Sequence, residues 1–305
     1  MKSDNKKYKI CTVVGTRPEI IRLSVILQKL DKNFEHHLVH TGQNFDKELS
    51  KNFFKDLNLK LPRYQIKSFA GGPIPTISKS LIEVDKILDR IKPDAFFVLG
   101  DTNSALTAIC AKKKKIPIFH YEAGNRCFDN RVPEETNRKI IDIISDINFT
   151  YSSLSKDNLI KEGLGSDRVI NIGSPMLEVL NFYKDKISRS KILNKLKIKK
   201  NNYILISAHR EENIETSSKL QNIFKIITYL SEKYKMPIIV STHPRLRKKI
   251  MNYKNKNVFF YKPFTFTDYI KLQESSKIVI SDSGTINEES SILDFDAINL
   301  REAHE

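Results

Sequence analysis

The chain has 305 residues, of which 40% are hydrophobic and 29% charged. This length exceeds one compact α/β core and suits two, and the composition excludes a chain that is disordered throughout. The formal net charge of +16 favours anionic partners, but the lysines are spread along the chain and their short clusters contain no interleaved aromatic residues. We therefore expect no nucleic-acid partner and interpret the excess lysine as solvated surface.

Three cysteines, Cys11, Cys110 and Cys127, lack the paired spacings of a zinc site or a disulfide framework. The N-terminus has no apolar stretch long enough for a signal peptide, and no later segment approaches ~18 uninterrupted apolar residues. These features predict a cytoplasmic protein with no membrane span, no bound metal and no cofactor.

From Tyr8 onward, short β-rich runs alternate with longer segments of helical apolar spacing, which is typical of a parallel sheet with crossover helices. The predicted strands are 9–14, 37–40, 95–99, 117–121, 147–151, 169–172, 203–207, 237–241, 258–261 and 278–281. A stretch rich in Lys, Asn and Ser, residues 183–202, separates the first six strands from the last four. We place the domain boundary near Pro175, so the predicted domains are 1–175 and 176–305.

The first predicted strand runs into the segment Gly15-Thr16-Arg17-Pro18-Glu19. Glycine permits a tight turn, Pro18 suits a first helical turn, and the free N–H groups at a helix start attract phosphate or carboxylate. Arg17 adds a fixed positive charge at the same place. The alternative is an ordinary βα turn with a solvated arginine. The loop matches neither the dinucleotide-binding glycine motif nor a P-loop.

Acidic residues follow the third and fourth predicted strands. Asp101 comes after strand 95–99 and Glu122 directly after strand 117–121, while Glu134 and Arg138 lie farther along the same turn-rich segment. Open α/β sheets bind ligands at the carboxyl ends of their strands. We therefore hypothesise that Asp101, Glu122 and Glu134 converge, raise one another's pKa and supply acid and base groups. The alternatives are a helix cap at Asp101 and a surface network of ion pairs.

Two histidine–arginine turns follow successive predicted strands in the second half, at His209-Arg210 and at His243-Pro244-Arg245. A lone histidine more often serves packing or lies on the surface. Two such turns at successive strand ends are less easily explained in that way. Because imidazole exists in both charge states near neutral pH, each histidine could bind a phosphate or transfer a proton.

The last predicted strand, 278–281, leads into a Ser283–Gly284 pair and a helix. Free N–H groups at a helix N-terminus bind anions, so this pair is a candidate pyrophosphate site. Thr285 and Glu288 also have the spacing of a capping box, which predicts ordinary helix initiation. The two roles are compatible with each other.

In chain order, the sequence contains the motifs GTRPE, GDTNS, HYEAGNR, RVPEETNRKIID, SAHREEN, STHPR and SDSGTINEE. Together these motifs resemble those of the non-hydrolysing UDP-N-acetylglucosamine 2-epimerase family. The segment HYEAGNRCFDNRVPEE is similar to the subgroup that makes UDP-N-acetyl-L-fucosamine. The resemblance implies a GT-B-like α/β fold, in which two Rossmann-like domains face a cleft. It also implies that the second domain is truncated, since the chain ends at Glu305 where the family continues.

The reaction implied by the resemblance inverts C2 of a UDP-N-acetylhexosamine through a glycal-like intermediate. This route needs carboxylates as acid and base, and cations for the departing diphosphate. Matched motif by motif, the resemblance assigns catalysis to Asp101, Glu122, Glu134 and His209. It assigns substrate binding to Arg17, Ser283, Gly284 and Glu289, and we add Arg22, Arg138 and His243 as further candidates for substrate binding. Arg22 stands where many family members have lysine, and its fixed guanidinium favours holding an anion over transferring a proton.

The resemblance also implies a UDP-N-acetylhexosamine as the partner, a homodimer, and a role in making precursors of surface polysaccharide. Two other functions are compatible with the sequence. One is a GT-B glycosyltransferase that uses a UDP-sugar, and the other is an inactive, truncated fragment that binds UDP-sugars. The dense carboxylates of the first half favour proton abstraction over glycosyl transfer.

Overall fold

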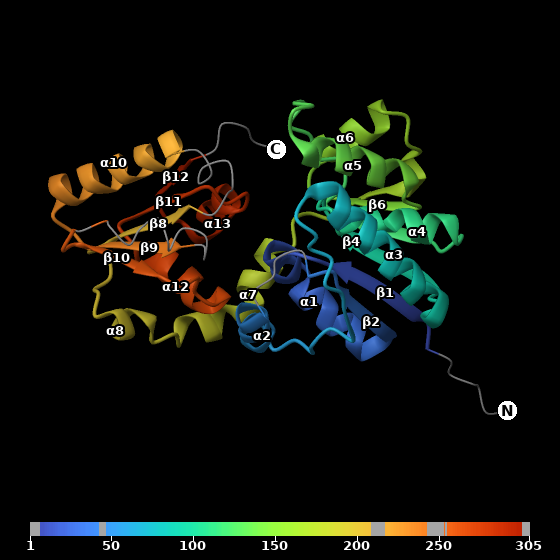
Figure 1. The fold of residues 1–305 in the computed structure, drawn as a ribbon, viewed down its shortest axis with the longest axis horizontal. Helices are drawn as coiled ribbons and strands as arrows, with labels where there is room; N and C mark the ends of the chain where they lie inside the picture. Colours follow the sequence, from blue (N-terminus) through green and yellow to red (C-terminus); the bar gives the residue numbers. More distant parts are fainter. Residues whose placement is uncertain (1–6, 43–46, 209–216, 243–252, 254, 301–305) are drawn as a thin grey trace. The chain divides into compact units, whose positions relative to one another are not determined.

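The computed structural model describes residues 7–42, 47–208, 217–242, 253 and 255–300. The chain divides into two compact units, Met1–Val179 and Leu180–His304. Each unit is built on a parallel β-sheet with helices packed against it (Figure 1). The α/β fold class predicted from the alternation of strands and helices is therefore confirmed.

The first unit contains, among its described residues, a seven-stranded sheet in the order β3-β2-β1-β4-β5-β6-β7. Its strands are β1 Lys9–Val14, β2 Glu35–His40, β3 Tyr64–Gln65, β4 Ala95–Leu99, β5 Ile118–Tyr121, β6 Ile147–Thr150 and β7 Val169–Asn171. Its helices are α1 Arg17–Asn33, α2 Lys47–Asp56, α3 Pro73–Ile91, α4 Ala108–Lys113, α5 Pro133–Ile144 and α6 Ser153–Lys161. Every neighbouring pair of strands is parallel, and the strand order reverses between β1 and β4. That reversal is the topological switch point, where open α/β sheets place their ligands.

The second unit contains a five-stranded parallel sheet in the order β10-β9-β8-β11-β12, again among its described residues. Its strands are β8 Ile204–Ala208, β9 Ile238–Thr242, β10 Val258–Tyr261, β11 Ile278–Ser281 and β12 Ala297–Asn299. Its helices are α8 Ile192–Leu196, α10 Ser217–Tyr234, α12 Phe266–Ser275 and α13 Ile286–Leu293. Helix α7, Met176–Ser188, contains the division between the two units.

The alternation of side chains explains why both faces of the second sheet are covered. Successive residues of a strand point to opposite faces. Leu205 belongs to an apolar cluster with residues of α8 and α12, whereas Ile204 and Ile206 belong to a different cluster with residues of α10. Figure 1 shows α10 on one side of this sheet and α8 and α12 on the other. The near-continuous apolar strands are those expected of a parallel sheet buried on both faces.

All ten predicted strands are present, each within two residues of its predicted limits. Two further strands, β3 and β12, were not predicted, and both lie at an edge of their sheet. They span two and three residues, which is too short for a recognisable side-chain period. None of the helices in the described part of the chain is both long enough and apolar enough to cross a membrane.

Candidate functional site

The candidate site lies at the carboxyl ends of three neighbouring strands of the first unit. Helix α1 follows β1, Asp101 follows β4, and Glu122 follows β5 directly. Because β1 pairs with β4 and β4 with β5, all in parallel, these strand ends meet at one edge of the sheet. This edge includes the topological switch point.

A buried arginine joins the two carboxylates that follow β4 and β5. Arg138 lies on α5 with its side chain 1% exposed. Its Nη2 donates to Asp101 Oδ2, and its Nη1 donates to the Glu122 carbonyl oxygen at 2.6 Å and to Glu122 Oε1 at 3.3 Å. A planar guanidinium can serve two acceptor groups at once because its donors point in fixed, divergent directions. The structure thus brings Asp101 and Glu122 to a single cation.

The remaining oxygen of Glu122 contacts a second arginine. Arg22, on α1, donates from Nη1 to Glu122 Oε2, and its guanidinium carbon lies 5.6 Å from the centroid of the Tyr151 ring. Glu122 itself has a left-handed backbone with φ of 70°, and its side chain is 8% exposed. This backbone region costs a non-glycine residue roughly 1–2 kcal/mol. The hydrogen bond from Arg138 to the Glu122 carbonyl oxygen helps to hold that conformation.

The two arginines decide the charge of Glu122. Burial by itself would raise the pKa of this carboxyl, but the charges and hydrogen bonds of Arg22 and Arg138 lower the pKa below its ordinary value. The prediction that clustered carboxylates raise one another's pKa is therefore wrong at Glu122, because guanidinium groups stand between them. An ionised carboxylate is suited to accept a proton rather than to donate one.

Glu19 is a buried carboxylate of this region that we did not predict as a site residue. Its Oε2 accepts hydrogen bonds from the Gly15 N–H at 2.9 Å, the Thr16 N–H at 2.6 Å and the Thr16 hydroxyl at 2.7 Å. Its Oε1 accepts from the Thr102 hydroxyl at 3.0 Å. Burial raises the pKa of Glu19 to about 7, although these hydrogen bonds oppose the rise. The available sequence signal was the Thr-x-x-Glu spacing of a capping box.

Helix α1 begins at Arg17, directly after the short loop that follows β1, and the Arg17 side chain is partly exposed. The glycine before it is required by close packing rather than by the tight turn that we predicted, since Gly15 does not have a left-handed backbone. A Cβ atom on Gly15 would lie 1.8 Å from Ser104 Oγ and 2.5 Å from Thr41 Oγ1. The β1–α1 loop can therefore approach the β4 loop only without a side chain at this position.

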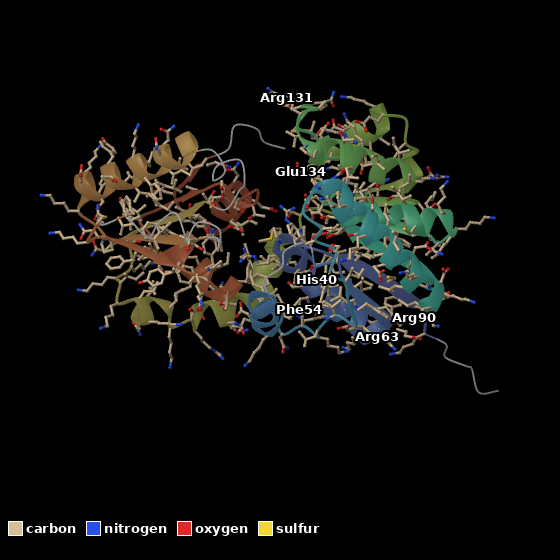
Figure 2. The ribbon with its side chains drawn as sticks, in the orientation of Figure 1. His40, Phe54, Arg63, Arg90, Arg131 and Glu134 are labelled. Carbon is tan, nitrogen blue, oxygen red and sulfur yellow. The ribbon has the colours of Figure 1, made fainter. Side chains whose placement is uncertain are left out.

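Glu134 lies in the first turn of α5, in the first unit (Figure 2). It precedes Arg138 by four residues, so the two share a face of the helix. Its side chain is partly exposed, whereas Glu122 is buried. The three predicted carboxylates thus lie after β4, after β5 and on α5. Arg138 contacts two of them, Asp101 and Glu122, directly.

In the second unit, the turn after β11 holds the described part of the predicted nucleotide site. The Ser283 and Thr285 hydroxyl oxygens lie 3.0 Å apart, and the Thr285 hydroxyl donates to Glu289 Oε1 at 2.6 Å. Gln273 donates to the other oxygen of Glu289 at 2.7 Å. The predicted capping box of Thr285 with Glu288 is wrong, because the Thr285 side chain makes no capping bond to the helix and contacts Glu289 instead.

Three other predicted site residues have few or no described contacts. Gly284 is exposed in the turn before α13. His209 and His243 lie outside the described residues. Within the described part of the chain, no group of three or more His, Cys, Asp or Glu side chains is arranged to hold a metal ion. Among the residues that the structure describes, Arg22 contacts Glu122, and Arg138 contacts both Asp101 and Glu122.

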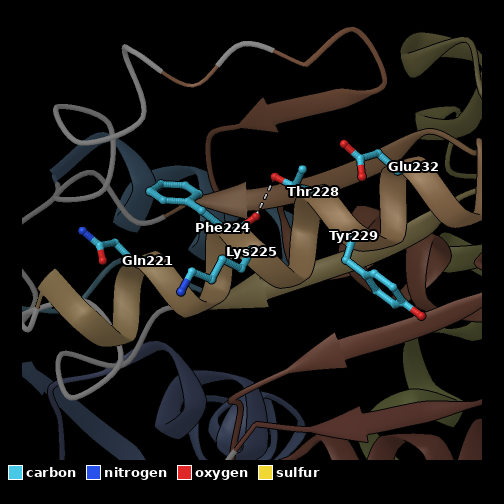
Figure 3. A pocket seen from close by; sticks show the side chains of 6 residues that line it. All are labelled: Gln221, Phe224, Lys225, Thr228, Tyr229 and Glu232. Atoms are coloured by element: carbon cyan, nitrogen blue, oxygen red, sulfur yellow. Dashed lines mark hydrogen bonds between the residues drawn. The ribbon is translucent and has the colours of Figure 1, made fainter.

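A pocket of about 420 Å³ runs along one face of α10 in the second unit (Figure 3). It is lined by Gln221, Phe224, Lys225, Thr228, Tyr229 and Glu232. Within it, the Thr228 hydroxyl donates to the Phe224 carbonyl oxygen at 2.8 Å, as in an ordinary helix. The pocket contains none of the predicted site residues, so we do not assign it to the candidate site.

Comparison with known proteins shows to which family the chain as a whole is similar. Residues 28–305 match the family model described as UDP-N-acetylglucosamine 2-epimerase. The structure of a UDP-N-acetylglucosamine 2-epimerase from Rickettsia bellii is 46% identical, with a TM-score of 0.90 and coverage of 98% of this chain and 80% of that chain. The Methanocaldococcus jannaschii UDP-GlcNAc 2-epimerase, solved in complex with UDP-GlcNAc and UDP, is 34% identical, with a TM-score of 0.89 and coverage of 97% and 84%. A UDP-2,3-diacetamido-2,3-dideoxy-D-glucuronate 2-epimerase from Pseudomonas aeruginosa is 31% identical over 97% of this chain and 84% of its own length.

Proposed function

Because this chain belongs to the UDP-N-acetylglucosamine 2-epimerase family, we propose that it inverts C2 of a UDP-linked N-acetylhexosamine without hydrolysing the nucleotide sugar. The GT-B-like α/β fold class expected from the sequence resemblance is confirmed by the two sheets and by the structural similarities. The observation that carries the proposal is Glu122, a buried carboxylate that Arg22 and Arg138 keep ionised at the carboxyl edge of a parallel sheet. A carboxylate that is ionised at neutral pH is in the charge state that a base needs.

The proposed reaction is an elimination followed by an addition. A base removes the C2 proton, the electron pair of that bond forms the C1–C2 double bond, and UDP leaves C1 with the electron pair of the C1–O bond. Addition of a proton to the opposite face of C2 and of UDP to C1 then gives the epimer. Two proton-transfer groups on opposite faces of the sugar ring are therefore needed.

We assign these proton transfers to Asp101, Glu122, Glu134 and His209, with Glu122 as the base that the described geometry favours. Arg22 and Arg138, which the sequence analysis gave as candidates for substrate binding, are proposed to set the charge of this base. Binding of the diphosphate and uridine is proposed for Arg17, His243, Ser283, Gly284 and Glu289. A cation and free helix N–H groups suit a departing diphosphate because its charge increases as the C1–O bond breaks.

Solvent exchange at C2 tests the proposal. The protein is incubated with UDP-N-acetylglucosamine in D₂O with no sugar acceptor, and C2 is followed by proton NMR. Epimerisation predicts deuterium at C2 together with the appearance of the C2 epimer. A GT-B glycosyltransferase would leave C2 unlabelled without an acceptor. Binding of UDP-sugar without any exchange would instead support a fragment that only binds.

The identity of the sugar is a second proposal. The Pseudomonas aeruginosa relative acts, by its name, on a different 2-acetamido sugar from the other two proteins, so membership of the family does not decide the substrate. We propose UDP-N-acetylglucosamine or the 6-deoxy-L-talosamine nucleotide that leads to UDP-N-acetyl-L-fucosamine. Parallel incubations with the two nucleotides, analysed by C2 configuration, should show a large preference in kcat/KM for one of them.

We further propose that the protein is a cytoplasmic homodimer whose domains span 1–175 and 176–305, and that it makes precursors of surface polysaccharide. The support for these points is the resemblance to the family. Light scattering during gel filtration tests the dimer, since a particle with the mass of one chain would contradict it. The cleft between the domains stays a prediction.

A further inference from the structure

Four ionisable side chains, of which three are buried, form a chain of contacts in the first unit that the proposed chemistry does not use. They are His120 on β5, Asp142 on α5, Arg126 in the loop after β5 and Glu162 after α6. His120 Nδ1 lies 2.9 Å from Asp142 Oδ1, and Arg126 Nη2 lies 2.8 Å from Asp142 Oδ2. Arg126 also contacts Glu162 through Nε at 2.8 Å and Nη2 at 2.5 Å. The side chains of His120, Asp142 and Arg126 are fully buried.

This chain of contacts extends to the backbone beside both candidate carboxylates. His120 Nε2 lies 2.9 Å from the carbonyl oxygen of Gly100, the residue that precedes Asp101. The Gly124 N–H, two residues past the carboxylate that follows β5, donates to both Asp142 oxygens at 3.3 Å. One imidazole–carboxylate pair therefore contacts the turn after β4 and the turn after β5.

The turn after β5 needs such support because the backbone of Glu122, which is not a glycine, is left-handed. The φ angles are 71° at Gly100, 70° at Glu122 and 77° at Gly124. A non-glycine residue in this region persists only when surrounding contacts over-determine it. A rotation of the backbone at Glu122 would move its carboxylate away from Arg138.

Helix α5 contacts these turns from two successive helical turns, one with Asn137 and Arg138 and the next with Asp142. Arg138 contacts the carboxylates of Asp101 and Glu122, and its neighbour Asn137 donates to the Asp101 carbonyl oxygen at 2.9 Å. Asp142 lies four residues after Arg138, on the same face of the helix. The Asp142 contacts thus fix the helix that carries Arg138, so a change at Asp142 reaches the candidate site through α5.

The neighbours of Asp142 offset the cost of burying its carboxylate. Burial by itself would raise the pKa of Asp142, but hydrogen bonding and charge from His120, together with Arg126, hold this pKa below its ordinary value. A buried carboxylate that loses its partners is strongly unfavourable. Loss of His120 or Arg126 should therefore raise the pKa of Asp142.

We propose that His120 and Asp142 form a positioning pair, which holds the turns of Asp101 and Glu122 and the helix of Arg138 in the geometry that proton transfer requires. The pair acts through backbone and helix, without touching substrate. Because displacements of about 1 Å at a reacting group can lower a rate about 100-fold, the effect should fall on kcat. This kinetic part rests on the proposed epimerisation.

The test compares two substitutions of His120 with a matched control. His120→Phe removes both ring contacts but fills the space, and His120→Gln keeps a donor for the Gly100 carbonyl oxygen. Asp146→Asn is the control, because Asp146 accepts from the Ile118 N–H at 2.9 Å at the opposite end of β5. We expect kcat for C2 exchange to fall about 100-fold in His120→Phe, with UDP binding largely unchanged. His120→Gln should recover part of the loss, and Asp146→Asn should lower stability while sparing kcat.

A second readout does not depend on activity. With ¹³C-labelled glutamate carboxyl groups, NMR titration follows the pKa of Glu122, assigned by its loss in Glu122→Gln. In His120→Phe this pKa should rise toward its ordinary value of about 4.3, because Arg138 is no longer held against the carboxylate. If the wild-type chain shows no C2 exchange, the proposed function fails, and this titration alone then decides the positioning.

Two results would overturn the positioning role. One is a His120→Phe protein with wild-type kcat and an unchanged Glu122 titration. The other is a His120→Phe protein whose kcat and melting temperature change only as they do in Asp146→Asn, with no recovery in His120→Gln, which would show that His120 supports the fold and nothing more.

Discussion

Replacing Arg138 with methionine removes the cation that joins the two candidate carboxylates. The change deletes hydrogen bonds to Asp101 Oδ2, to the Glu122 carbonyl oxygen and to Glu122 Oε1. These contacts are largely shielded from water, since the Arg138 side chain is 1% exposed and the Glu122 side chain 8%. Removing one partner of a buried ion pair leaves an uncompensated charge and costs about 3–5 kcal/mol. We expect a loss of that size in the stability of the first unit at pH 7.

The loss should depend on pH in one direction. Burial opposes ionisation of Glu122, but Arg22 and Arg138 outweigh it and lower the pKa of this carboxyl. Its ionisation therefore contributes stability above the unfolded pKa of about 4.3, and this contribution is lost as the pH falls through the lower folded value. In Arg138→Met, much of this pH-dependent contribution of Glu122 to stability should be absent. The difference in stability between the two proteins should be large at pH 7 and should shrink below about pH 4.

Hydrogen exchange of peptides from β4, β5 and α5 measures the free energy of opening in this part of the first unit. Arg131→Met is the matched control, because Arg131 is 91% exposed and pairs with Asp129 at 2.7 Å (Figure 2). Exposed ion pairs contribute little, so this variant should exchange like the wild type. Equal effects of the two substitutions, or a difference that does not change with pH, would refute the reasoning about Arg138.

Glu122→Gln should abolish C2 exchange and leave UDP binding by calorimetry largely intact, because an amide cannot take up the proton; a variant that keeps most activity removes Glu122 from its proposed role. Glu19→Gln should flatten a pH dependence. Burial raises the pKa of Glu19 from 4.5 to about 7, so the wild type should lose on the order of 3 kcal/mol of unfolding free energy as the pH rises across this interval, whereas parallel curves for the two proteins would contradict the raised pKa. Gly124→Ala should lower the melting temperature far more than Gly100→Ala, since a Cβ would lie 2.2 Å from the Ser155 carbonyl oxygen at Gly124 but 3.8 Å from its nearest neighbour at Gly100; equal melting temperatures would count against this packing.

The central strands of both sheets were predictable because their local sequence is distinctive. Strands such as β1 and β4 are short, nearly continuous apolar runs, and each is followed by a turn and an amphipathic helix. The edge strands β3 and β12 were not predictable in this way. Each has two or three residues, and its strand conformation depends on pairing with β2 or β11, which local sequence does not report.

The positions of the candidate carboxylates follow from strand ends, but their charge states do not. Glu122 meets Arg22 and Arg138, which lie 100 and 16 residues away in the chain, so the lowered pKa depends on tertiary contacts that spacing cannot reveal. For Glu19, the sequence indicated a local role but not the burial of the side chain. Its Thr-x-x-Glu spacing was visible as a helix start, whereas its burial against the Thr102 loop appears only in the fold.

Parallel pairing throughout the first sheet gives each strand two ends with different duties. At the amino end of β5, Asp146 accepts a hydrogen bond from the Ile118 N–H. At the carboxyl end, Glu122 lies in the candidate site and contacts Arg22. Substitutions in carboxyl-edge loops that carry none of the proposed site residues should therefore change the surroundings of the site, whereas substitutions at the amino edge should mainly lower stability. Anyone redesigning sugar preference should confine a mutational library to the loops of the carboxyl edge and leave the opposite edge untouched.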